Sequence, residues 1–165
     1  MVAVYDKLIA EVIKDHATAW GFLRDKADYL TGADRPAQAL EAWEASRRFV
    51  EAGTDNWLDT EVFRARLLAK LGRHAEAIAV FDSASNVKSL TTLHRANLLA
   101  EKAMVLSKAG RHNEALACAE QTEELLRQIE TNGDKESVTK FIRFKLRIAR
   151  GEERNKDNKA AHRDR

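Results

Sequence analysis

The feature that most constrains this chain is a stretch of sequence that recurs after 38 residues. Residues 67–81 (LLAKLGRHAEAIAVF) align with residues 105–119 (VLSKAGRHNEALACA), and eight of the fifteen positions are identical. A weaker copy at residues 29–43 lies a further 38 residues upstream and is in phase with the other two. Self-similarity at such a period is the signature of stacked supersecondary units, none of which can bury its apolar face alone. We therefore expect a repeat architecture.

Each copy is predicted to be a pair of antiparallel helices. Apolar residues at helical spacing run up to Gly72 and to Gly110, and a second periodic stretch begins a few residues later. Glycine readily adopts the left-handed conformation that ends a helix, so each glycine is expected to close the first helix of its pair. In the first copy the turn glycine is displaced to Gly32, and we expect Asp34 to cap the second helix and Pro36 to lie in its first turn.

The whole chain is predicted to be an all-α solenoid of such pairs. Its 165 residues include only seven glycines and one proline, too few for the many turns of a β-sandwich or barrel. The expected organisation is a single domain over residues 1–150, with an N-terminal helix at 4–16, repeats at about 20–53, 57–86 and 90–130, a capping helix at 135–150, and a disordered polar tail at 151–165.

The helix pairs resemble the tetratricopeptide repeat (TPR) family. The second copy carries the family's small and aromatic positions at Ala65, Gly72, Ala77, Phe81 and Ala84. Two departures are a period longer than the usual length of about 34 residues and the lack of the proline that typically ends a repeat. The resemblance implies a module that binds a peptide or helix of a partner protein in a groove lined by the first helix of each pair. It places these residues in that groove: Arg24, Asp28, Thr31, Asp59, Val62, Arg66, Lys70, Asn97, Ala100, Met104 and Lys108.

Catalytic and metal-binding signatures are lacking in the sequence. There is no HExxH or His-x₃-His pair, no glycine-rich phosphate loop, no Gly-x-Ser-x-Gly and no CxxC. His74 and His112 follow the turn in two copies, which favours a structural role for both. The single cysteine, Cys118, is expected to be a buried thiol and gives no sign of an oxidising compartment. We expect a cytoplasmic, non-enzymatic protein without metal, cofactor, signal peptide or membrane span.

Charge is unevenly distributed, although the net charge is only +2. Residues 112–130 are predominantly acidic and residues 135–150 predominantly basic. The favoured interpretation is that these two neighbouring helices attract each other. The alternative is an adaptor that contacts nucleic acid or an acidic partner through the basic C-terminal helix and the tail, residues 135–165. Phe141 and Phe144 lie among these charges, but their helical spacing makes us expect them in the core. The candidate patch comprises Lys140, Arg143, Arg147 and Arg150.

Two further hypotheses concern the role of the whole chain. Three repeats in about 165 residues resemble the size of bacterial secretion chaperones of the TPR class, a match that rests on length and repeat number alone. The chain could also form a homo-oligomer through Trp20, Trp43 or Trp57, provided that one of these side chains is exposed.

Overall fold

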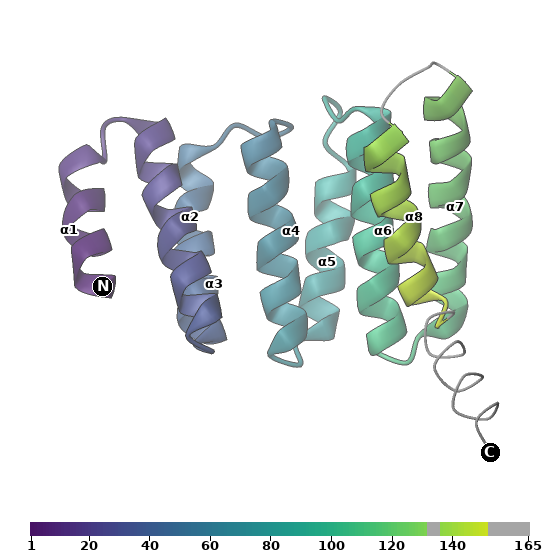
Figure 1. Ribbon diagram of the computed structural model, residues 1–165, viewed down its shortest axis with the longest axis horizontal. Helices are drawn as coiled ribbons and strands as arrows, with labels where there is room; N and C mark the ends of the chain where they lie inside the picture. The colour runs from purple at the N-terminus through teal and green to yellow at the C-terminus, as the bar shows by residue number, and fades with distance from the viewer. Residues whose placement is uncertain (132–135, 152–165) are drawn as a thin grey trace. The chain divides into compact units, whose positions relative to one another are not determined.

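The computed structural model describes residues 1–131 and 136–151, and within these ranges the chain is helical and contains no strand (Figure 1). The predicted polar tail lies, apart from Gly151, outside the described residues. The elements are α1 (Val2–Val12), α2 (His16–Gly32), α3 (Pro36–Ser46), the 3-10 turn η1 (Arg47–Phe49), α4 (Asp55–Lys70), α5 (His74–Ser85), α6 (Thr92–Lys108), α7 (His112–Thr131) and α8 (Glu136–Ala149).

The helices form two compact units, which are described separately. The first unit, Met1–Ser89, holds α1 to α5, and the second, Leu90–Arg165, holds α6 to α8. Within the first unit α2 packs against α3 and α4 against α5, and within the second α6 packs against α7. These adjacent pairs, each joined by a short turn, confirm the predicted all-α fold of antiparallel helix pairs.

The N-terminal helix is shorter than predicted, because Asp15 starts a new helix. The Asp15 side chain accepts a hydrogen bond from the backbone N–H of Thr18 at 3.4 Å, which caps α2. The helix expected at residues 4–16 is therefore divided between α1 and the first turn of α2. No residue of α1 is fully buried, and an ion pair of 2.5 Å between Lys26 Nζ and Asp6 Oδ1 joins α1 to α2.

All three helix pairs close through the same backbone turn. The N–H of Gly72 bonds to the carbonyl of Ala69 at 3.1 Å, and the N–H of Arg73 reaches back to the carbonyl of Leu68 at 2.9 Å. Equivalent bonds surround Gly110, and both glycines are left-handed, with φ of +78° and +76°. This is the Schellman motif, which satisfies the last carbonyls of a helix. The predicted role of both glycines is thereby confirmed.

The first pair uses an aspartate in the position of the glycine. Asp34 lies 38 residues before Gly72 and has a φ of 54°, while Arg35 N–H bonds to the carbonyl of Leu30 at 2.9 Å. The expectation that Asp34 caps α3 is wrong, because Arg35 is the N-cap residue and no side chain bonds to the free N–H groups there. Gly32 is the last residue of α2. Pro36 does begin α3, as predicted.

Large aromatic side chains fill the core of the first unit. The ring of Trp43 stacks on that of Phe63 with centroids 5.1 Å apart, and Trp20 Nε1 donates a hydrogen bond of 3.0 Å to Thr60 Oγ1. Trp20, Trp43 and Trp57 are all buried. The condition for self-association through a tryptophan is therefore not met.

Small residues let the helices of the second unit approach closely. Ala96 and Ala100 of α6 are fully buried and belong to one apolar cluster with Leu126 of α7 and with Ile142 and Leu146 of α8. Helix α8 thus covers the core between α6 and α7.

Candidate functional site

The predicted groove residues of the first unit lie on α2 and α4. The Trp20–Thr60 hydrogen bond joins these two helices. Arg24 on α2 and Arg66 on α4 both lie close enough to Asp59 on α4 to lower the pKa of that carboxyl, so these predicted positions lie near one another. We call this surface the α2–α4 face, and define it by Arg24, Asp28, Asp59 and Arg66.

The basic side chains of this face lie over aromatic rings. The Arg24 guanidinium lies 5.2 Å from the ring centroid of Trp20 and donates to Asp25 Oδ1 at 2.9 Å. The Arg66 guanidinium lies 5.2 Å from the ring centroid of Phe63. Stacking on a ring restricts a long side chain, so less conformational entropy is lost when a ligand contacts it.

The surroundings of the acidic side chains of this face disfavour their ionised form. Partial burial raises the pKa of Asp59, and the neighbouring carboxylate of Asp55 raises it further, while Arg24 and Arg66 act in the opposite direction. Partial burial also raises the pKa of Asp28. A cationic group placed beside either carboxylate would stabilise its ionised form.

Two predicted groove residues of α4 are engaged elsewhere. Val62 retains only 5% of its surface and belongs to the core, so its predicted place in an open groove is wrong. Lys70 Nζ donates to Asp34 Oδ1 at 2.8 Å and so pairs with the turn between α2 and α3.

In the second unit, α8 covers part of the predicted groove wall. Lys145 Nζ lies 2.6 Å from both Glu101 Oε1 and Asn97 Oδ1, and Ala100 on the same helix is fully buried. Asn97 and Ala100, which were predicted to face a ligand, therefore contact α8 instead. A lysine buried to this extent was not predictable from composition, because lysine is almost always exposed unless it is paired.

The last two predicted groove residues border a hollow at the C-terminal end of α8. Met104 and Lys108 line it together with Ile148 and Gly151, and its volume is about 230 Å³. Lys108 is exposed and Met104 half-buried.

Several basic residues of α8, and Arg150 directly after it, lie near acidic side chains of the second unit. Arg143 Nε and Arg150 Nη1 lie 3.5 and 3.7 Å from the two carboxylate oxygens of Glu123 on α7. This geometry is the attraction between acidic and basic helices favoured by the sequence, and it reduces the charge available to nucleic acid. Lys140 and Arg147 are exposed.

The expectation that Phe141 and Phe144 belong to the core is wrong. Their exposed fractions are 56% and 43%, because the opposite side of α8, with Ile142 and Leu146, packs on the core.

An ion network in the first unit, centred on the buried side chains of Glu61 and Arg64 and completed by the exposed side chains of Arg47 and Glu44, was not predicted from the sequence. Arg64 Nη1 donates to Glu61 Oε2 at 2.5 Å, Arg47 Nε to Glu61 Oε1 at 2.8 Å, and Arg64 Nη2 to Glu44 Oε1 at 3.1 Å. These four side chains line a hollow of about 300 Å³. Their charges balance one another, so the network supports packing and offers no excess charge to a ligand. The only signal in the sequence is the three-residue spacing of Glu61 and Arg64.

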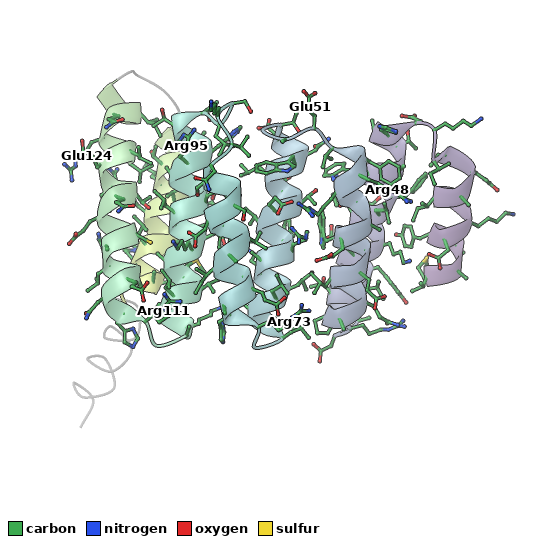
Figure 2. All side chains as sticks on the ribbon, turned by 180° about the vertical axis from the view of Figure 1, so that it is seen from behind. Arg48, Glu51, Arg73, Arg95, Arg111 and Glu124 are labelled. Carbon is green, nitrogen blue, oxygen red and sulfur yellow. The ribbon has the colours of Figure 1, made fainter. Side chains whose placement is uncertain are left out.

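The arginine that follows each glycine turn is fixed by the same ion pair in two copies. Arg73 donates two hydrogen bonds of 2.7 Å to the carboxylate of Glu76, and Arg111 donates two of 2.6 Å to that of Glu114. Figure 2 shows Arg73 and Arg111 at the turns that open α5 and α7. These hydrogen bonds lower the pKa of Glu76 and of Glu114.

The last candidate features are the cysteine thiol, a metal site and a membrane span. Cys118 is buried, as predicted. Among the described residues, no three histidine, cysteine, aspartate or glutamate side chains come together as a metal site would require. No helix in the same ranges is long and apolar enough to cross a membrane.

Comparisons with known proteins agree with the repeat architecture. The sequence profile of the tetratricopeptide repeat matches residues 58–128. A crystal structure of nearly identical TPR-like repeats, from a protein named as a kinesin light chain of Podosopora anserina, matches with a TM-score of 0.59 and 18% sequence identity. The match covers 92% of this chain and 86% of that one. No curated protein sequence matches the chain.

Proposed function

Since this chain is a tetratricopeptide-repeat protein, we propose that it is a non-catalytic interaction module whose α2–α4 face binds a peptide segment of a partner protein. Repeats of this kind generally bind protein partners. The finer part of the proposal, the face and the kind of ligand, rests on the geometry of the first unit. A single cysteine suits a reducing compartment, so the proposed setting is cytoplasmic.

The observation that carries the proposal is the combination of charges on the α2–α4 face. Arg24 and Arg66 lie over aromatic rings, and Asp28 and Asp59 are surface carboxylates whose pKa values are raised by partial burial. Surface carboxylates with raised pKa values are ionised at neutral pH at some cost in free energy, and a bound cation would reduce that cost.

These properties favour a peptide that carries a basic side chain next to a carboxylate group. The basic group would contact Asp59, and the acidic group would contact Arg66, which lies close enough to influence Asp59. Opposite charges on one face fix the register of the peptide as well as its affinity.

Site-specific photo-crosslinking tests the location of the ligand. A photoreactive phenylalanine derivative replaces Arg66 in one protein and Arg48, an exposed arginine of the 3-10 turn that also lies over a ring, in a matched control. We expect crosslinking in extracts of the source cell to attach the partner at position 66 and not at position 48. Equal yields at the two positions would refute the proposed face.

Charge reversal tests the chemistry of recognition. Arg66→Glu and Asp59→Lys should each weaken capture of the crosslinked partner, whereas Glu41→Lys, an exposed change on α3, should not. Each variant is first checked for native helicity by circular dichroism. Undiminished capture by both α4 variants would show that the partner binds elsewhere.

A further inference from the structure

Helix α8 has an apolar stripe on the side that faces away from the core. Phe141, Phe144 and Ile148 are 56%, 43% and 37% exposed, and their spacing of three and four residues places them on one side of the helix. In the described part of the second unit the only other large exposed apolar side chain is Leu116, on α7. We call the three residues the α8 stripe. It extends over two helical turns, about 10 Å.

Basic side chains flank the α8 stripe. Lys140 and Arg147 are exposed and seven residues apart, so they lie along one edge of it, and the Arg147 guanidinium is 5.7 Å from the ring centroid of Phe144. At the C-terminal end of the stripe, Ile148 also lines the 230 Å³ hollow that Lys108 and Met104 border. The surface therefore combines an apolar centre with positive charge at its border.

The rest of the second unit holds α8 in place. Its core side is buried through Ile142 and Leu146, Lys145 forms a buried ion pair with Glu101, and Arg143 lies near Glu123. The stripe is thus presented on an anchored helix, which limits the loss of conformational entropy when a partner binds.

We propose that the α8 stripe is a docking surface for an acidic amphipathic helix of another protein. A partner helix with apolar residues at positions i, i+3 or i+4, and i+7 matches the spacing of the stripe, and glutamates or aspartates beside them match Lys140, Arg147 and Lys108. This proposal does not depend on peptide binding by the α2–α4 face, because it involves other residues in the other unit.

Two other occupants fit less well. Residues 152–165 contain no apolar side chain larger than the methyl groups of Ala160 and Ala161, so they cannot bury two phenylalanines and an isoleucine. A second copy that stacks its stripe antiparallel about a two-fold axis would place Lys140 and Arg147 beside the same residues of its partner. Like charges at that border oppose such a dimer.

The test uses two labelled synthetic peptides of about 18 residues that share one leucine stripe on an alanine-rich helix. One peptide has glutamates flanking the leucines and the other has lysines. Fluorescence anisotropy with the full-length protein should show that the glutamate peptide binds at least about tenfold more tightly than the lysine peptide at low salt, with the difference decreasing as salt is added. No binding of the glutamate peptide, or equal binding of the two, overturns the proposal.

Variants locate the binding. Phe144→Ser and Ile148→Ser should each weaken binding of the glutamate peptide, and the double variant should bind it about tenfold or more weakly than the wild type does. Phe141 is left intact because its ring lies 4.6 Å from Lys145 Nζ, which belongs to the buried ion pair. Leu116→Ser is the matched control and should leave binding unchanged. If this control weakens binding as much as the double variant does, the α8 stripe is not the site.

Charge reversal separates the remaining explanations. Lys140→Glu with Arg147→Glu should reverse the preference toward the lysine peptide, while Arg127→Glu, an exposed change on α7, should not. Light scattering of the wild type and of the Phe144→Ser/Ile148→Ser variant tests the second copy. A wild-type dimer that becomes a monomer in that variant would overturn the proposal and assign the stripe to self-association.

Discussion

The same chemical change, glycine to alanine, should have opposite effects on stability at Gly21 and at Gly72. Gly21 lies in the middle of α2 with a helical backbone, whereas Gly72 closes α4 in the left-handed conformation, with a φ of +78°. In the part of the chain that the structure describes, an added Cβ at either position has no atom within 4 Å apart from its local backbone and chain neighbours. The two substitutions therefore differ in backbone conformation and not in packing.

The magnitudes follow from the backbone alone. Alanine is favoured over glycine inside a helix by about 0.5–1 kcal/mol, so Gly21→Ala should raise the free energy of unfolding by that amount. An alanine in the left-handed conformation costs about 1–2 kcal/mol, so Gly72→Ala should lower the free energy of unfolding by about 1 kcal/mol or more. The two variants should thus differ by about 2 kcal/mol.

Urea denaturation followed by circular dichroism at 222 nm measures this difference. Both glycines lie in the first unit, so the two variants report on the same unfolding transition. In thermal melts each kcal/mol corresponds to about 2–4 °C for a chain of this length. Gly110→Ala repeats the test in the second unit and should also be destabilising. A Gly72→Ala variant as stable as the wild type would refute the assignment of the left-handed turn.

Three further predictions concern charged groups. Lys145→Met should destabilise the protein by about 3–5 kcal/mol, because the buried carboxylate of Glu101 loses its ion pair with Lys145. Lys145→Met combined with Glu101→Met should restore most of that loss, as measured by urea denaturation. The lowered pKa values of Glu76 and Glu114 mean that their contribution to stability is present above their ordinary pKa of 4.5 and is lost as the pH falls through the lowered values. Gln at both positions should therefore flatten the acid limb of a plot of unfolding free energy against pH. The pKa of Asp59 is raised, so its ionised carboxylate lowers the free energy of unfolding at neutral pH, and Asp59→Asn should stabilise the protein there. This gain should disappear as the pH falls toward the ordinary pKa of 3.8. A destabilised Asp59→Asn variant at pH 7 would contradict burial as the cause of the shift.

The repeat unit was predictable from the sequence because its determinants are local. Gly72 and Gly110 close their helices through backbone conformation, which depends on the residue itself and its nearest neighbours. The same logic could have identified Asp34, which lies one period before Gly72. Aspartate tolerates the left-handed conformation less well than glycine, so the glycine pattern alone favours Gly32 at this turn.

The surfaces were less predictable, because exposure depends on which side of a helix meets its neighbours. Helix α8 carries two apolar sides, one with Ile142 and Leu146 and one with Phe141 and Phe144, and its periodicity alone does not say which is buried. The structure buries the aliphatic side and also Lys145, because Glu101 on α6 supplies the opposite charge. Val62 was misplaced for a similar reason, since it lies on the side of α4 that faces the core.

The glycine turns have a consequence for how the number of repeats in such a chain can change. The bonds that close each turn run between backbone atoms of a few consecutive residues. Among the described residues, none but the neighbours in the chain lies within 4 Å of a Cβ added at Gly72 or Gly110. A duplication or deletion of whole 38-residue segments with both breakpoints at these turns would therefore recreate each junction intact. Lengthening or shortening such a chain requires new contacts only between neighbouring helix pairs, and the junctions themselves can be inherited without change.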